Sequence, residues 1–191
     1  MKKILFLNCC IRENSRTLRL SQSYLDKIKN ESEYQIEEVF LSTLDISPLN
    51  RQSLDTRDKD IACGNTDSDK YRLAHEFAAA DKIVIAAPYW DSSFPSVLKV
   101  YIENISVKGI TFECGDDGKP VKKCHADSLV YITTSGGFIN KNPGVKIFME
   151  ELCSWFVIDD FKFYCAQGLD IIPDKVDNIL SGTLSEMSSE L

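Results

Sequence analysis

Short apolar runs alternate with longer segments of helical period along this chain. Residues 4–7 and 83–87 are continuous apolar runs, which is typical of strands buried on both faces of a sheet. Between residues 97 and 105, by contrast, the main apolar side chains fall on one helical face. This alternation predicts a parallel sheet that is covered by helices on both faces.

The order of these segments predicts five strands in one open sheet. We expect strands at residues 4–7, 34–41, 82–87, 129–133 and 161–165. We expect helices after Ser15 and over residues 68–80, 97–105, 145–156 and 174–187, with Gly109 as the C-cap of the third. Five strands that alternate with helices predict a doubly wound α/β sheet of order 2-1-3-4-5, in a single domain over residues 1–191.

Two segments interrupt this alternation. Residues 110–123, with Asp117-Gly118 in the middle, predict a short hairpin inserted before the fourth core strand. Residues 42–69 are polar and have no clear period, so they predict a long loop. A loop of that length in a compact domain is usually functional or mobile.

Charge and cysteine usage exclude several classes of partner. The chain has 22 Lys and Arg against 29 Asp and Glu, a formal charge of −7, which disfavours nucleic acid and anionic membranes. No apolar run approaches the about 20 residues that span a bilayer, and the N-terminal apolar run stops at Asn8, too early for a signal peptide. The seven cysteines form no CxxC pair, and His75 and His125 belong to no ligand cluster, so no metal is expected. We expect a cytoplasmic protein with reduced thiols.

Ligands of open α/β sheets bind outside the carboxyl ends of the strands, at the point where the strand order reverses. Three predicted loops follow strands at that place, at residues 8–17, 88–95 and 134–140. The first loop has no glycine, so it contains neither G-x-G-x-x-G nor G-x-x-x-x-G-K-[ST]. It places Ser15, Arg16 and Thr17 at the start of a helix, where hydroxyls, a guanidinium and unpaired amides suit a phosphomonoester. The alternative is that Ser15 is an ordinary N-cap and Thr17 a bystander.

The other two loops carry aromatic and glycine residues. Tyr89 and Trp90 follow directly after a buried strand and Pro88, which predicts a wall against a flat ligand, although a dimer contact or a core anchor would use the same residues. The third loop, Thr-Ser-Gly-Gly at residues 134–137, allows backbone to approach a ligand closely, but any tight turn could use a diglycine.

Taken together, these segments resemble the flavodoxin-like NAD(P)H dehydrogenase (quinone) and FMN-dependent NADH-azoreductase family. The resemblance covers most of the chain and is densest over residues 81–137. It is carried by residues 83–88 followed by an aromatic and then 95–102, by residues 109–112 followed by Asp117-Gly118, and by residues 161–163 with 166–168.

The resemblance implies an FMN-dependent NAD(P)H:quinone oxidoreductase or azoreductase with a flavodoxin-like fold. Such enzymes are homodimers with the active site at the subunit interface. They transfer hydride from NADH or NADPH to flavin N5 in a ping-pong reaction and then reduce a quinone or an azo or nitroaromatic compound. No side chain is expected to be a catalytic acid or base, because the cofactor carries the chemistry.

The resemblance also implies roles for individual residues. Ser15, Arg16 and Thr17 would hold the FMN phosphate with Cys9 nearby, residues 88–92 would follow the pyrimidine edge of the ring, and residues 134–137 would flank the ring. The implied FMN-binding residues are Cys9, Ser15, Arg16, Thr17, Pro88, Tyr89, Trp90, Asp91, Ser92, Thr134, Ser135, Gly136 and Gly137. We expect Trp90 and Phe94 to form the wall of the substrate pocket.

Two residues depart from the family's pattern. Asp91 stands where many azoreductases carry Asn, and an ionised carboxylate near the ring would lower the flavin potential; the alternative is that Asp91 points to solvent. Ser135 stands where they often carry Arg, which favours neutral quinones or nitroaromatics over anionic dyes.

Two other functions remain open at this point. An FMN-binding electron carrier without NAD(P)H turnover would share the same three loops. A thiol redox sensor would use Cys9 and Cys10, although adjacent cysteines rarely form a relaxed disulfide.

Overall fold

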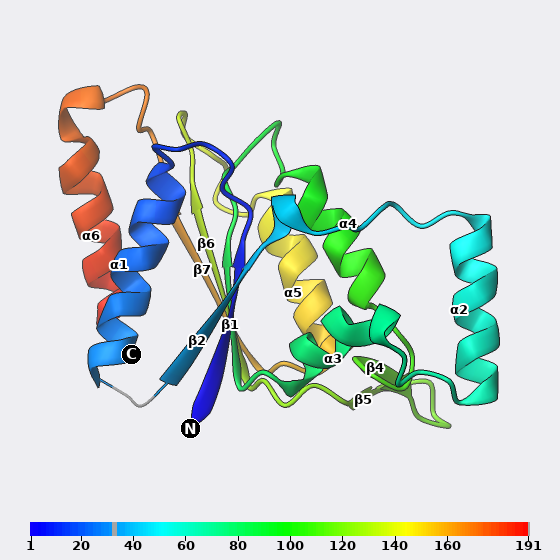
Figure 1. The fold of residues 1–191 in the computed structure, drawn as a ribbon. Coiled ribbons are helices and arrows are strands. Elements are labelled where there is room, and N and C mark those ends of the chain that lie inside the picture. The colour runs from blue at the N-terminus through cyan, green and yellow to red at the C-terminus, as the bar shows by residue number, and fades with distance from the viewer. Residues whose placement is uncertain (32–33, 191) are drawn as a thin grey trace.

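Five parallel strands form the central sheet in a computed structural model that describes residues 1–31 and 34–190. They are β1 (Lys2–Asn8), β2 (Tyr34–Phe40), β3 (Lys82–Ala86), β6 (Ser128–Thr134) and β7 (Asp160–Ala166), in the spatial order β2-β1-β3-β6-β7. Numbered among themselves, these strands have the order 2-1-3-4-5, so the predicted doubly wound sheet is confirmed (Figure 1).

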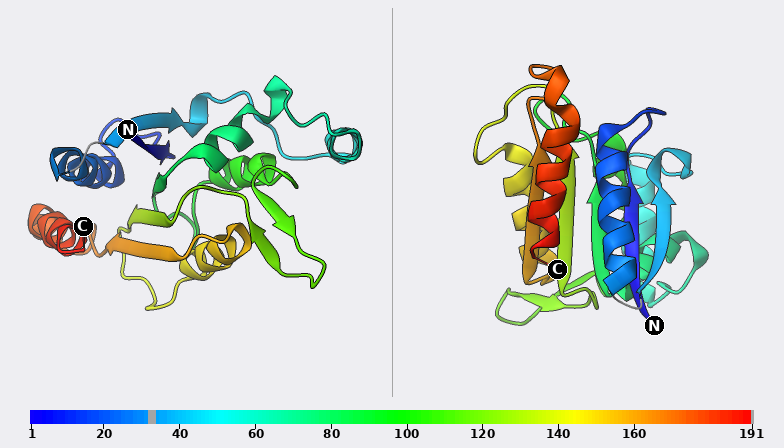
Figure 2. Two further views of the ribbon diagram at one scale, coloured as in Figure 1. Left: turned by 90° about the horizontal axis from the view of Figure 1, so that it is seen from below. Right: turned by 90° about the vertical axis from the view of Figure 1, so that its left-hand side faces the viewer.

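Helices cover both faces of the sheet. On one face α1 (Arg16–Glu31) and α6 (Val176–Ser188) lie side by side (Figure 2, right). The other face carries α3 (Arg72–Ala79), α4 (Ser96–Ile105) and α5 (Gly144–Phe156). None of the helices in the described residues is both long and apolar enough to cross a membrane.

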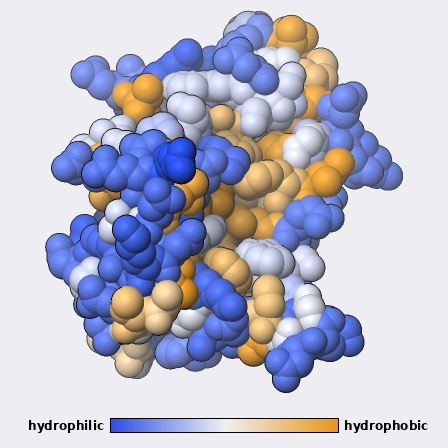
Figure 3. Space-filling view, turned by 90° about the vertical axis from the view of Figure 1, so that its right-hand side faces the viewer, coloured by the Kyte–Doolittle hydropathy of each residue, from blue (hydrophilic) through white to orange (hydrophobic). Residues whose placement is uncertain are grey.

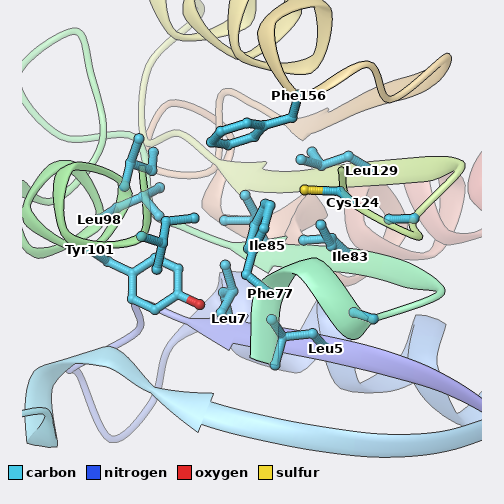
Figure 4. Packing of buried hydrophobic residues seen from close by; sticks show 14 of the residues in the cluster. Leu5, Leu7, Phe77, Ile83, Ile85, Leu98, Tyr101, Cys124, Leu129 and Phe156 are labelled. Atoms are coloured by element: carbon cyan, nitrogen blue, oxygen red, sulfur yellow. The ribbon is translucent and has the colours of Figure 1, made fainter. Parts of the chain in front are cut away.

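The alternation of side chains along each strand separates two hydrophobic clusters, because successive residues point to opposite faces. Leu5, Leu7, Ile83 and Ile85 pack toward α3, α4 and α5 in the cluster drawn in Figure 4. The intervening residues, such as Ile4 and Val84, pack against α1 and α6. Both faces of β1 and β3 are therefore buried, as their continuous apolar runs predict.

The inserted hairpin is present, but it lies away from the three loops. It consists of β4 (Phe112–Cys114) and β5 (Pro120–Lys122), which pair antiparallel. Figure 1 places it beyond the amino ends of the sheet strands, whereas the three loops follow their carboxyl ends. The prediction that Gly109 caps the preceding helix was wrong: α4 ends at Ile105 with Ser106 as its C-cap, and Gly109, at φ 86°, forms the turn into the hairpin.

Residues 42–69 are not a continuous loop, which corrects the prediction. They contain α2 (Arg51–Cys63). The N-cap Asn50 and Ser53 form a capping box at its start, and Gly64, in the left-handed conformation, is its C-cap. All residues of α2 lie in the described part of the chain, and none of them is fully buried. The helix stands away from the layers around the sheet (Figures 1 and 2). A helix whose large apolar residues are only Leu54 and Ile61 shows no clear apolar period, so the sequence pattern missed it.

Short 3-10 turns complete the fold at Leu41–Thr43, Asp69–Tyr71 and Pro173–Lys175. α2 is attached to the body by Ile61, which packs partly buried against the core cluster, and by a few polar contacts. The Arg57 guanidinium donates to the carbonyls of Glu103 and Ser106 at 3.0 and 3.2 Å, and the Tyr71 hydroxyl donates to the Asp60 carboxylate at 2.9 Å.

Candidate functional site

A cavity of about 400 Å³ opens at the carboxyl edge of the sheet, between the ends of β1, β3 and β6. All three predicted loops contribute to its wall. It is lined by Arg12, Asn14, Ser15, Arg16, Thr17, Pro88, Tyr89, Trp90, Thr134, Ser135, Gly136, Leu169 and Asp170. Its size and its mixture of polar and aromatic walls suit a small organic ligand.

The start of α1 forms the polar end of the cavity. α1 begins at Arg16, and Ser15 is its N-cap, since the Ser15 hydroxyl accepts a hydrogen bond of 3.2 Å from the Leu18 amide. Ser15 also lines the cavity, so the capping role and a ligand-binding role are compatible. The first amides of the helix have no partner within it, which together with the helix dipole favours an anion at this end.

Backbone hydrogen bonds hold the aromatic loop and the diglycine loop together. The Tyr89 amide donates to the Thr134 carbonyl at 3.1 Å, which fixes the start of the aromatic loop against the end of β6. The Ser135 amide in turn donates to the Ala166 carbonyl at 2.9 Å, at the end of β7. The cavity wall is therefore an extension of the sheet itself.

Trp90 is positioned by a tight turn. Its backbone exchanges two hydrogen bonds with Ser93, at 2.9 and 2.7 Å, and the two residues between them have φ values of 49° and 63°. These residues, Asp91 and Ser92, are therefore in the left-handed conformation that non-glycine residues seldom adopt. The Arg12 guanidinium lies 5.6 Å from the centre of the Trp90 ring, in a cation–π arrangement.

Four lining residues escaped the sequence analysis: Arg12, Asn14, Leu169 and Asp170. Arg12 and Asn14 lie in the first loop, but no motif singles them out. Leu169 and Asp170 follow β7, whose carboxyl end meets the same edge of the sheet as β6. Extending the search to the loop after every strand would have found these two.

Cys9 does not reach the cavity, which corrects the expectation that it lies beside the phosphate position. Its side chain is fully buried in the core cluster of the α4 face. Burial raises the pKa of Cys9 well above its ordinary value and, as the largest cause, raises the pKa of Cys10 to about 11. Two buried thiols with raised pKa values are poorly suited to the thiol-sensor alternative, because the thiolate is the reactive form.

The remaining predicted residues lie at or outside the rim. Asp91 and Ser92 are exposed and do not line the cavity, and Gly137 is also outside its lining. Phe94 lines a neighbouring hollow of about 460 Å³ together with Trp90 and Asp91, so the structure brings Trp90 and Phe94 to one surface. The exposure of Asp91 favours the alternative in which its carboxylate faces solvent.

Fold and cavity together define an open, doubly wound α/β protein with a cavity at the switch point between the first and third core strands, where such folds bind ligands. The sequence profile of a family with a flavodoxin-like fold matches residues 2–191. The chain therefore belongs to this flavodoxin-like family, and the resemblance seen in the sequence is confirmed.

Relatives and solved structures agree with this assignment. The chain is 34% identical over 193 residues to an FMN-dependent NADH:quinone oxidoreductase of Clostridium beijerinckii, with 97% of this chain and 96% of the relative covered. A second such enzyme, from Clostridium acetobutylicum, is 30% identical over 198 residues, with 100% of this chain and 98% of the relative covered. The fold is similar to that of a Bacillus anthracis FMN-dependent NADH-azoreductase solved with FMN, with a TM-score of 0.80, 19% identity and 99% of each chain covered.

Proposed function

We propose that this protein is an FMN-dependent NADH:quinone oxidoreductase that acts as one domain over residues 1–191. The observation that carries the proposal is the single cavity that joins anion-binding groups at the start of α1 to an aromatic wall and a glycine-containing loop. The names of the Clostridium relatives supply the donor and the acceptor class.

The residues of the cavity fit FMN at both ends. Ser15 and Arg16 offer a hydroxyl, a guanidinium and helix-terminal amides to a phosphate, and Thr17 would contribute through its backbone, because its buried hydroxyl is hydrogen-bonded to Thr134. Tyr89 and Trp90 offer flat apolar surface to an isoalloxazine ring. When bound, FMN would supply hydride acceptance from NADH and onward reduction of the acceptor.

The chain's own contribution is position, charge and exclusion of water. Among the described residues that line the cavity there is no His, Cys or Glu, and the one carboxylate, Asp170, is paired with Arg16. This lining suits a reaction without a side-chain acid or base, as expected when a cofactor carries the chemistry. A ping-pong order follows if donor and acceptor use the same aromatic surface in turn.

For the acceptor we propose small quinones first, with azo and nitroaromatic compounds as further substrates. Ser135 is 6% exposed and brings no charge to the wall, which suits a neutral acceptor. NADH is proposed as the donor from the relatives' names, and NADPH as the slower alternative.

We propose a cytoplasmic homodimer in which a second copy covers the open side of the cavity. Figure 3 shows apolar side chains gathered in a hollow of the face that carries α2. Because no residue of α2 is fully buried against its own body, a second copy would give the exposed side of α2 a packing partner. Sedimentation equilibrium should give twice the mass of 21.6 kDa, and a monomer at micromolar concentration would contradict the dimer.

The cysteines support the cytoplasmic location. All seven lie in the described residues and are free, which suits a reducing compartment. Fractionation of the native host would test the location.

Flavin binding and turnover test the proposed function directly. The purified protein should bind FMN in a 1:1 ratio in an absorbance or fluorescence titration and then oxidise NADH with a quinone present. Arg16→Gln should weaken FMN binding, whereas Arg19→Gln, one turn further along α1 and outside the cavity, should not. FMN binding without NADH oxidation would favour the electron-carrier alternative, and failure to bind FMN would overturn the proposal.

A further inference from the structure

Asp170 places a carboxylate inside the cavity, at the end where a phosphate would bind. Its Oδ1 accepts a hydrogen bond of 2.6 Å from the Arg16 guanidinium, although the two residues are 154 positions apart. Both side chains line the cavity. An acidic side chain is unexpected in a pocket that otherwise offers hydroxyls, a guanidinium and helix-terminal amides to an anion.

A backbone hydrogen bond holds Asp170 beside Gly136, which has no side chain and so leaves room for the carboxylate. The Asp170 amide donates to the Gly136 carbonyl at 2.9 Å. A Cβ added at Gly136 would overlap the Asp170 carboxylate, so glycine at that position leaves room for the carboxylate. The side chain itself is 69% exposed, which leaves it free to turn toward solvent.

We propose that Asp170 is a specificity-determining residue that competes with the cofactor phosphate for Arg16. The inference rests on the proposed FMN function and deepens it. With no phosphate present, the Asp170 carboxylate pairs with the Arg16 guanidinium at the N-terminus of α1, where a negative charge is favoured. Binding of FMN requires Arg16 to exchange this partner for the phosphate, whereas riboflavin, which has no phosphate, leaves the pair intact. Asp170 thus reduces the margin by which the site prefers FMN over riboflavin.

A matched ion pair on the same helix provides the control. Arg19 pairs with Asp177 at 2.8 Å, again between α1 and the segment that follows β7, and both side chains are exposed. Neither residue lines the cavity. Asp177→Asn therefore removes a carboxylate of the same kind and from the same region without altering the cavity's own charge.

Dissociation constants for FMN and riboflavin, measured by quenching of flavin fluorescence at low ionic strength, test the inference. We expect Asp170→Asn to bind FMN about three- to fivefold more tightly than the wild type, the effect of an exposed ion pair, with riboflavin unchanged. Asp177→Asn should leave both constants unchanged. In the Arg16→Gln background the effect of Asp170→Asn should disappear, because the competition acts through Arg16.

The outcomes separate the two proposals. If the wild type binds FMN but Asp170→Asn binds it equally or more weakly, the competition is wrong and the proposed function stands. If Asp170→Asn tightens FMN binding to the same extent in the wild-type and the Arg16→Gln backgrounds, the effect does not act through Arg16, and the proposed competition for Arg16 is wrong. If the wild type binds no FMN, the proposed function fails and this inference fails with it.

Discussion

Thr17 and Thr134 share a hydrogen bond of 2.6 Å between their Oγ1 atoms, across 117 residues of sequence. Thr17 belongs to the first turn of α1 and is 1% exposed, and Thr134 is the last residue of β6. This contact joins the start of α1, at the polar end of the cavity, to the loop that contributes Gly136 to the cavity wall. The hydrogen bond therefore fixes the start of α1 relative to the loop after β6.

Replacing Thr17 by Val should therefore lower the free energy of unfolding by about 1 kcal/mol, since it removes the bond and leaves the Thr134 hydroxyl without this partner. Urea unfolding monitored by circular dichroism measures the change. Thr134→Ser keeps a hydroxyl and serves as the control, with a smaller effect. Equal stability of the Val variant and the wild type would show that the bond contributes nothing.

Gly168→Ala should be more destabilising than Gly64→Ala. Both glycines have positive φ, 76° and 69°, so both substitutions place an alanine in an unfavourable conformation. A Cβ at Gly168 would also lie 2.8 Å from the Phe138 ring, whereas a Cβ at Gly64 meets nothing within 4 Å. We expect about 1–2 kcal/mol for Gly168→Ala and less for Gly64→Ala, in the same unfolding assay. The reverse order would contradict the contact with Phe138.

The cysteines should fall into fast and slow classes toward a thiol reagent. Cys63 and Cys114 are exposed and should react first. Burial holds the pKa of Cys10 at about 11, so at pH 8 only about one thiol in a thousand is ionised there, and Cys9 is more deeply buried. A Cys63→Ser, Cys114→Ser double variant should lose the fast phase, while Cys9 and Cys10 react only on unfolding. Rapid modification of Cys9 in the folded double variant would revive the thiol-sensor alternative.

Asp91→Asn should leave the midpoint potential of bound flavin unchanged. The carboxylate is exposed and outside the lining of the cavity, so water screens it from the ring. Asn tolerates the left-handed conformation at φ 49° at least as well as Asp, so the turn is preserved. Redox titration checks this expectation. A higher potential in the variant would instead support the hypothesis that Asp91 acts on the flavin.

Arg12→Gln should impair anionic acceptors more than neutral ones. Arg12 lies against Trp90 and brings a positive charge to the aromatic end of the cavity, where Ser135 brings none. Values of kcat/KM for a sulfonated and an unsubstituted quinone, measured side by side, give the ratio. We expect a severalfold fall for the sulfonated compound and little change for the other. An equal fall for both would indicate a role in packing on Trp90 alone.

Most of the fold was predictable because the central strands of the sheet are buried on both faces. A strand such as β3 is apolar at every position after Lys82, and that pattern is visible in the sequence without knowledge of its neighbours. α2 escaped because none of its residues is fully buried and only Ile61 packs partly against the core, so no apolar period marks it. Gly109 misled for a related reason: a glycine after a helical segment suits a C-cap, but here it serves the turn that follows.

The sequence alone determined the alternation of buried strands and helices, because that follows from local periodicity. The strand order and the three loops at the carboxyl edge were then predicted from the common arrangement of doubly wound sheets. Only the tertiary structure decided which side chains share the cavity. It placed Asp170 against Arg16, directed Cys9 into the core and left Asp91 outside. Such contacts join residues that are distant along the chain, and they depend on side-chain direction at the end of each strand, which composition and periodicity do not encode.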